Sequence, residues 1–223
     1  MSTEKSVSLL QRVHWICNTI YHQLVAIVAV YVSYIFFKYI NIDNRSLWHN
    51  FLCTTAYIPL MAEGFILFSE QNVWSQRLER KKKYYIHGIL LAVSTISLSV
   101  GIGLKIDVKN QHFKSDHAIT GLASWILALA SVILGMFAAY SQVLKRFLKP
   151  VILKLIHNFL GMASFAIGIA SLCLGLYYRD FAGRVTTIER DTTLWLVGIV
   201  STWSVLNAIV SQFNQLRSLL SSN

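Results

Sequence analysis

Two stretches of this sequence repeat one pattern: residues 117–124 read His-Ala-Ile-Thr-Gly-Leu-Ala-Ser, and residues 157–164 read His-Asn-Phe-Leu-Gly-Met-Ala-Ser. Each stretch opens a long apolar segment along which small residues continue at spacings of about three or four. On a helix, this spacing places the small residues on one face. We therefore expect two helices that each begin with a histidine. Along the helix after that histidine, the small residues would form a groove that can accommodate a neighbouring helix or a flat ligand.

The composition is that of a membrane protein. Of the 223 residues, 55% are hydrophobic and 13% are charged, whereas soluble domains have a charged share of roughly 25%. The net charge of +10 comes from short basic clusters between apolar runs, which is typical of cytosolic loops, so we expect no nucleic-acid partner. Cys17, Cys53 and Cys173 have no Cys-x2-Cys spacing, which indicates neither a disulfide framework nor a thiolate metal site.

Six apolar segments are each long enough to cross a lipid bilayer, which takes about 20 residues in a helix. Only short loops separate them, so no soluble domain is expected on either side of the membrane. We predict an all-α fold, an integral membrane six-helix bundle that forms a single transmembrane domain over residues 1–223. The predicted spans are residues 17–39, 47–68, 85–104, 118–140, 155–178 and 193–213.

Basic clusters orient this predicted bundle. Residues 77–83 hold five lysines and arginines before the third span, and residues 145–154 hold four before the fifth. The positive-inside rule places both loops, and with them both termini, in the cytosol. Residues 1–13 lack the apolar core and cleavage site of a signal peptide, so we expect the N-terminus to be retained. The sequence carries no organelle address, and we expect a membrane of the endoplasmic reticulum or of endosomes or vesicles.

Four histidines open four consecutive predicted spans: His49, His87, His117 and His157. Alternating topology places His49 and His117 at the non-cytosolic level, and His87 and His157 together near the cytosol. Ionisable side chains within a membrane are rare and usually face the bundle interior. Zinc sites use three or four protein ligands, whereas haem supplies its own equatorial nitrogens and needs only axial ligands. This pairing favours two haems in a four-helix di-haem core made of helices 2–5.

With the six predicted spans, four runs around these histidines, at residues 47–49, 85–88, 116–121 and 155–161, resemble the cytochrome b561 family. The short N-terminus and residues 63–69 (Glu-Gly-Phe-Ile-Leu-Phe-Ser) look most like its stand-alone "domain-containing protein 2" branch. The runs that carry the family resemblance are residues 47–49 (Leu-Trp-His), 85–88 (Tyr-Ile-His-Gly), 116–121 (Asp-His-Ala-Ile-Thr-Gly) and 155–161 (Leu-Ile-His-Asn-Phe-Leu-Gly).

The resemblance implies a transmembrane ascorbate-dependent reductase with two haem b groups. Such a protein takes electrons from cytosolic ascorbate and passes them to monodehydroascorbate or ferric iron chelates on the lumenal or extracellular side. Carried over residue by residue, His49 and His117 would hold the non-cytoplasmic haem b, and His87 and His157 the cytoplasmic one. When histidines fill both axial positions of a haem iron, no position is left for a substrate, so electrons are expected to pass through the edge of the haem.

The substrate sites of the family are less well matched. Other branches carry a lysine three residues before the histidine of the third span, and here that position is Tyr84. Lys81 and Lys83 are the candidate replacements, because an anionic substrate needs a cation rather than a fixed bidentate geometry. On the far side, many family members have a histidine in the loop between the third and fourth spans, for which His112 with Phe113 is the candidate.

Glu63 lies on the second predicted span, about 21 Å deeper than His49 and on a similar face. Two interpretations of Glu63 stay open: proton uptake or potential tuning near the cytoplasmic haem, or a hydrogen-bonded contact between helices. Pro59, one turn earlier, is expected to kink the helix. His14 and His22 fall outside the four-histidine set, and we interpret both as structural or interfacial.

Two rival functions also stay open. One is a haem-containing membrane anchor that passes electrons to a partner protein. The other is a metal transporter that lines its path with histidine and contains no haem. The lipid bilayer is an expected partner in every case, and the sequence leaves open whether the chain forms a homodimer.

Overall fold

The computed structural model describes residues 8–142, 144–146, 149–178 and 180–221. The described residues form helices and no strand, which confirms the all-α prediction for them. The retained N-terminus predicted for residues 1–13 falls partly outside the described residues. Five helices are long and apolar enough to cross a membrane: α1 (Leu9–Tyr39), α4 (Arg80–Asp107), α5 (Asp116–Ala139), α6 (Pro150–Tyr177) and α7 (Thr187–Leu220).

The predicted span at residues 47–68 is not one regular α-helix. α2 (Arg45–Thr55) runs into a π-helical segment, η1 (Ala56–Met61), and then into α3 (Ala62–Ile66). Pro59 lies inside η1, and because proline has no amide N–H, regular α-helical hydrogen bonding cannot continue through it. The expected distortion at Pro59 is therefore a π-helical turn. The three pieces together form one helical run of about 30 Å, enough to cross the hydrocarbon core.

The five long helices start before the predicted spans, and polar residues cap three of these starts. The side chain of Ser8 accepts a hydrogen bond from the Gln11 amide at the start of α1, and Ser115 does the same for Ala118 at the start of α5. A capping box formed by Thr186 begins α7. The apolar pattern predicts the middle of each helix, and the caps determine where α1, α5 and α7 begin. One further short element, η2 (Leu144–Arg146), is a 3-10 turn.

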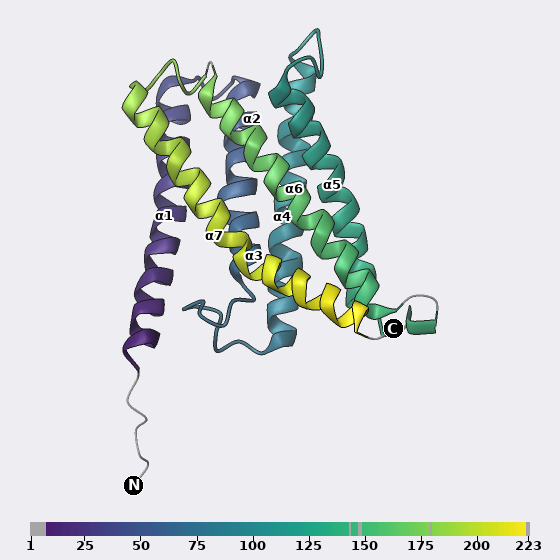
Figure 1. The fold of residues 1–223 in the computed structure, drawn as a ribbon. Helices are drawn as coiled ribbons and strands as arrows, with labels where there is room; N and C mark the ends of the chain where they lie inside the picture. Colours follow the sequence, from purple (N-terminus) through teal and green to yellow (C-terminus); the bar gives the residue numbers. More distant parts are fainter. Residues whose placement is uncertain (1–7, 143, 147–148, 179, 222–223) are drawn as a thin grey trace.

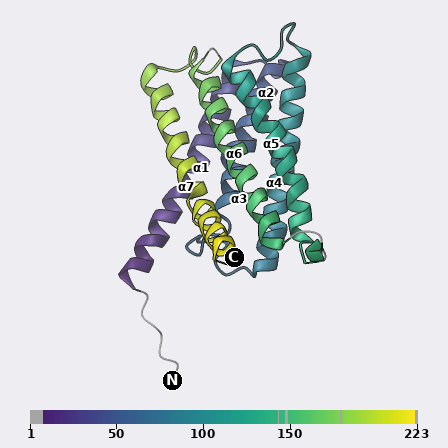
Figure 2. The ribbon, with the colours of Figure 1, turned by 45° about the vertical axis from the view of Figure 1, so that its right-hand side comes forward.

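The helices alternate in direction, and their starts define the two ends of the bundle (Figure 1). We call one end the basic end: there α1, α4 and α6 begin, α7 terminates, and the basic clusters before α4 and α6 lie. At the opposite end, α2 and α5 begin. In both ribbon views α5 and α6 run side by side (Figures 1 and 2), and they pack together more extensively than any other described pair of helices.

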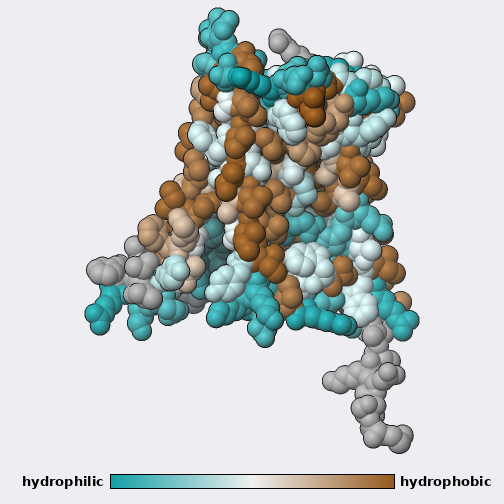
Figure 3. Space-filling view, turned by 180° about the vertical axis from the view of Figure 1, so that it is seen from behind, coloured by the Kyte–Doolittle hydropathy of each residue, from teal (hydrophilic) through white to brown (hydrophobic). Residues whose placement is uncertain are grey.

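The face of the molecule drawn in Figure 3 is largely apolar around the middle of the helices and polar at the two ends. Apolar side chains such as Val30, Ile96 and Ile126 are more than half exposed at mid-helix positions. Exposed apolar surface of this extent is unusual on a soluble monomer and is what lipid contact requires. The fold therefore fits an integral, multi-pass membrane protein.

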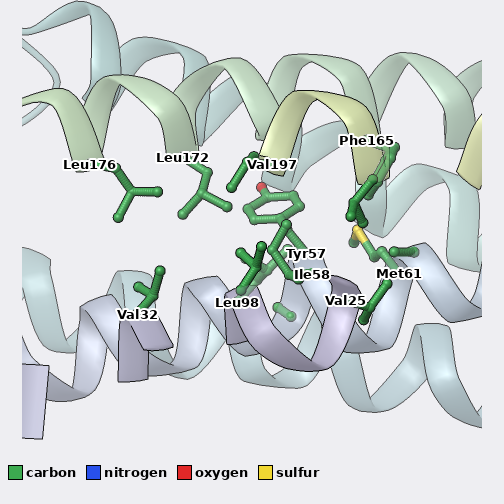
Figure 4. Packing of buried hydrophobic residues seen from close by; sticks show 14 of the residues in the cluster. Val25, Val32, Tyr57, Ile58, Met61, Leu98, Phe165, Leu172, Leu176 and Val197 are labelled. Carbon is green, nitrogen blue, oxygen red and sulfur yellow. The ribbon is translucent and has the colours of Figure 1, made fainter. Parts of the chain in front are cut away.

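Buried apolar side chains fill the space between α1, η1, α4, α6 and α7. Val25 and Val32 from α1 and Leu98 from α4 face Leu172 and Val197 from α6 and α7 (Figure 4). Some buried polar groups are paired across helices, such as the Tyr57 and Ser124 hydroxyls, which lie 2.8 Å apart, and the Ser94 hydroxyl, which donates to the Ala56 carbonyl at 3.0 Å. The core fixes the helices that carry the four histidines.

Candidate metal centres at two histidine pairs

The structure brings together the histidines that the topology placed at the same level. His49 of α2 and His117 of α5 meet at the opposite end, with ring centroids 6.1 Å apart. His87 of α4 and His157 of α6 meet at the basic end, with ring centroids 6.2 Å apart. The two rings of each pair lie nearly perpendicular, at 84° and 83°. The two pairs therefore share one geometry at the two ends of the bundle.

In all four histidines, Nδ1 donates to a backbone carbonyl of another helix. Because a carbonyl can only accept, each Nδ1 carries the proton and each Nε2 keeps its lone pair. Within the described part of the chain, no Nε2 of these four has a hydrogen-bond partner. The bonds run from His49 to Gly101 (2.9 Å), from His87 to Gly64 (3.0 Å), from His117 to Ser171 (2.8 Å) and from His157 to Ser131 (3.0 Å).

The accepting carbonyls follow a rule that sequence reasoning missed. Each carbonyl belongs to the helix of another histidine of the set and lies about 21 Å further along that helix. In α4, α5 and α6 it comes fourteen residues after that helix's own histidine, at Gly101, Ser131 and Ser171, whereas in the second span Gly64 comes fifteen residues after His49. The π-helical segment η1 lies between His49 and Gly64 and accommodates the extra residue. A small residue at this distance was the signal available in the sequence.

The spacing of each pair fits a metal held between the two Nε2 atoms. A metal–imidazole bond of about 2.0–2.1 Å, added to about 1.2 Å from nitrogen to ring centre, places two axial rings about 6.4 Å apart. The described residues contain no group of three or more His, Cys, Asp or Glu side chains that could hold a metal ion. Each pair therefore suits a centre that brings its own remaining ligands, as haem does.

The small residues of the repeated pattern face each other across α5 and α6. The Ser124 hydroxyl donates to the Ser164 carbonyl at 2.7 Å, and the Ser164 hydroxyl donates to the Ser124 carbonyl at 2.8 Å. These reciprocal bonds relate the antiparallel helices by an approximate two-fold axis. Of the two uses expected for the grooves, close helix packing is the one that this contact demonstrates.

The last glycine of each groove makes room for the histidine of the other helix. A Cβ atom added at Gly135 would lie 2.9 Å from Cε1 of His157, and one added at Gly175 would lie 3.0 Å from Cε1 of His117. The first separation is too short for a real Cβ atom, and the second is tight enough that the ring would have to shift, so each ring lies close to the backbone of the other helix. The repeat therefore positions the histidines as well as the helices.

At the basic end, an aromatic line leads from the surface to His87. The rings of Tyr84 and Phe68 lie 5.3 Å apart, and those of Phe68 and His87 lie 5.4 Å apart. Arg80 donates from Nε to the Tyr84 hydroxyl at 3.0 Å and lies over its ring. Phe68 and Arg80 were not singled out from the sequence, because their link to His87 depends on how the segment before α4 folds.

The other substrate candidates lie on the surface. Lys81 is exposed and Lys83 is half-buried in the first turn of α4, close in sequence to Arg80. His112 and Phe113 are exposed in the loop between α4 and α5, where their rings lie 6.1 Å apart. Among the described contacts, none joins either of them to His49 or His117. His112 and Phe113 thus lie at the same end of the bundle as the pair His49 and His117, without a described contact to it.

Glu63 forms a hydrogen-bonded helix contact, one of the two roles left open for it. Its carboxylate lies 2.6 Å from Nδ1 of His22 on α1 and accepts from the indole of Trp74 at 3.1 Å. Glu63 also directly precedes Gly64, whose carbonyl orients His87. His22 is thus part of a polar contact between α1 and α3 that the sequence did not indicate.

Comparison with known proteins adds two findings. The family model described as "Eukaryotic cytochrome b561" matches residues 48–182, a range that holds all four paired histidines. A Mus musculus protein named "Transmembrane reductase CYB561D2" is 31% identical over 103 residues, which are 44% of this chain and 46% of that protein. The alignment thus spans less than half the length of this curated relative.

Proposed function

Because this chain belongs to the eukaryotic cytochrome b561 family, we propose that it is a transmembrane oxidoreductase that transfers electrons through two b haems. The printed name of its relative, a transmembrane reductase, supports this class of activity. One haem would lie at each end of the bundle. Haem supplies one-electron redox chemistry when it is bound, and the protein supplies its axial ligands.

The two histidine pairs carry the proposal. His49 and His117 would hold the haem at the opposite end, and His87 and His157 the haem at the basic end. The supporting observation is that all four rings donate Nδ1–H to a carbonyl, which leaves Nε2 as a ligand and raises its basicity. Pair spacings of 6.1 and 6.2 Å match two axial imidazoles.

The basic end is the entry side in this proposal. The positive-inside rule supports a cytosolic position for this end, and the electron donor that we propose there is ascorbate. Arg80 is the cation best placed to bind this anion, since it lies on Tyr84 at the start of the aromatic line to His87. Lys81 and Lys83 add positive charge around it. At the opposite end, monodehydroascorbate or a ferric chelate accepts the electron.

A reduced-minus-oxidised visible spectrum of the purified protein tests the haem assignment. We expect a sharp b-type α-band that ascorbate alone develops. Replacing His87 or His157 by alanine should remove about half of the bound haem, and the remaining half should depend on His49 and His117. His14→Ala, which changes a histidine outside both pairs, is the control and should keep all of it.

The same preparation separates the rival functions. A protein without a b-type α-band would be no cytochrome, and the haem-free transporter would take the place of our proposal. A haem-replete protein that ascorbate reduces, but that does not reduce a ferric chelate by itself, would be a membrane anchor for a partner protein.

A further inference from the structure

A polar cluster lies at the basic end outside the histidine pairs. His22 of α1 and Glu63 of α3 form its centre, with Nδ1 and Oε1 only 2.6 Å apart. Each side chain is about one-fifth exposed, at 20% and 19%, so water can reach a group that is otherwise enclosed. His22 lies outside the range matched by the family model.

The hydrogen bonds of His22 require a proton between the two side chains. Nε2 faces two amide oxygens, Oδ1 of Asn18 at 3.1 Å and Oδ1 of Asn72 at 3.3 Å. The Asn18 oxygen is identified by the bond it accepts from the Val73 amide, so Nε2 must be an N–H donor. Nδ1 would then be a bare lone pair against a carboxylate unless a second proton lies between them. The described geometry therefore suits the proton-bound form of the pair, in which one proton is shared between Nδ1 and Oε1.

The pair is closely connected to the orientation of His87. Glu63 directly precedes Gly64 in α3, and the Gly64 carbonyl accepts the Nδ1–H bond of His87 at 3.0 Å. The other carboxylate oxygen of Glu63 accepts from Trp74 at 3.1 Å. A change in the charge of the pair would thus act on the same short helix that positions this ligand.

The described contacts of the pair involve few other titratable groups. Among ion pairs between described residues, Glu63 has no lysine or arginine partner. From α1, Tyr21 contacts the pair: its ring lies 5.1 Å from that of His22, and its hydroxyl bonds Ser204 of α7. α4 contributes His87, and the segment after α3 contributes the neutral Asn72 and Trp74. Among the groups in these contacts, we take the His22–Glu63 pair as the one whose net charge changes when the shared proton binds or leaves.

We propose that the His22–Glu63 pair is a redox-linked proton site, which takes up one proton from the cytosol when the centre at the basic end gains an electron. This inference rests on the proposed function. Ascorbate oxidation releases one electron and one proton as the ascorbyl radical anion forms, and both are accounted for: the electron enters the centre, and a proton from the cytosolic solution binds between Nδ1 and Oε1. The proton returns to the cytosol when the electron moves on.

The physical reason is electrostatic. An added electron makes the basic end more negative, and within a low-dielectric bundle this favours the protonated form of a nearby group. By linkage, a proton that binds more tightly to the reduced form makes the reduction potential fall as pH rises. For one proton per electron, the limit is about 59 mV for each tenfold change in proton concentration.

The test is a spectroelectrochemical titration of the haem-loaded full chain between about pH 5.5 and 8.5. In the wild type, the potential of the centre at the basic end should fall with rising pH. The isosteric change Glu63→Gln, and separately His22→Gln, should flatten that slope while haem content is kept. Tyr21→Phe is the matched control, because it removes a buried hydrogen bond of the same helix and leaves the pair intact.

A second measurement does not depend on potentials. The reduced-minus-oxidised infrared spectrum should contain carboxylate or imidazole bands that disappear in Glu63→Gln and remain in Tyr21→Phe. Equal slopes and equal bands in the wild type and in both variants of the pair would overturn the inference and leave the two-haem proposal standing. Absence of any b-type α-band in the wild type would overturn both.

Discussion

At the scale of single residues, the decisive contacts are the four bonds from histidine Nδ1 to backbone carbonyls. Each bond fixes the ring, its tautomer and the direction of Nε2 before any metal binds. The acceptors are main-chain atoms of Gly64, Gly101, Ser131 and Ser171, so they persist when side chains change. The ligand geometry is therefore built into the packing of the helices.

Arg80 offers a test of electron entry at this scale. Arg80→Gln removes the guanidinium beside Tyr84, and because Arg80 is exposed, we expect only a three- to tenfold rise in KM for ascorbate, about 0.7–1.4 kcal/mol. The turnover number should change little. Lys82→Gln, which removes one positive charge from the same turn of α4, is the control for general electrostatic attraction. Equal rises in KM for both variants would show that Arg80 has no specific role.

The sequence predicted the histidine pairs but not the partners around them. His49, His87, His117 and His157 could be paired because helix direction and depth follow from the apolar pattern and the basic loops. The contact between His22 and Glu63 could not be predicted, since it joins two helices whose relative rotation the pattern leaves free. It also depends on the folded segment that holds Asn72 and Trp74.

At the scale of helices, the pair α5 and α6 forms the tightest unit. Gly168 is its most crowded position: a Cβ there would overlap the Tyr57 ring and lie 2.6 Å from the Ser124 hydroxyl. We expect Gly168→Ala to destabilise the folded protein by about 1–3 kcal/mol, as overpacked cores do. Thermal unfolding in detergent measures it, with Gly103→Ala as control, since no atom lies within 4 Å of a Cβ at Gly103. Equal stability of the two variants would contradict the packing described here.

Two sequence patterns left the structure of the helices open: the small residues at helical spacing and Pro59. Small residues at helical spacing favour either a helix or a flat ligand, and only the reciprocal bonds of Ser124 and Ser164 show that a helix occupies that face. Pro59 predicted a distortion, but its form, the π-helical segment, depends on the packing around it. The offset of fifteen rather than fourteen residues between His49 and Gly64 follows from that segment.

At the scale of the whole molecule, the fold places one histidine pair at each end of an apolar bundle. The face drawn in Figure 3 is apolar in the middle and polar at both ends, which fits a protein that crosses the bilayer with one histidine pair near each membrane face. The central claim is that electrons cross the membrane through both pairs.

Vesicles that contain the purified protein, with ascorbate trapped inside and a ferric chelate outside, test this claim most directly. We predict that the external chelate is reduced, and that His87→Ala and His117→Ala each abolish this reduction because each removes one of the two centres. His14→Ala should reduce the chelate as the wild type does. Reduction at the wild-type rate by either paired-histidine variant, or none by the haem-replete wild type, would contradict the account.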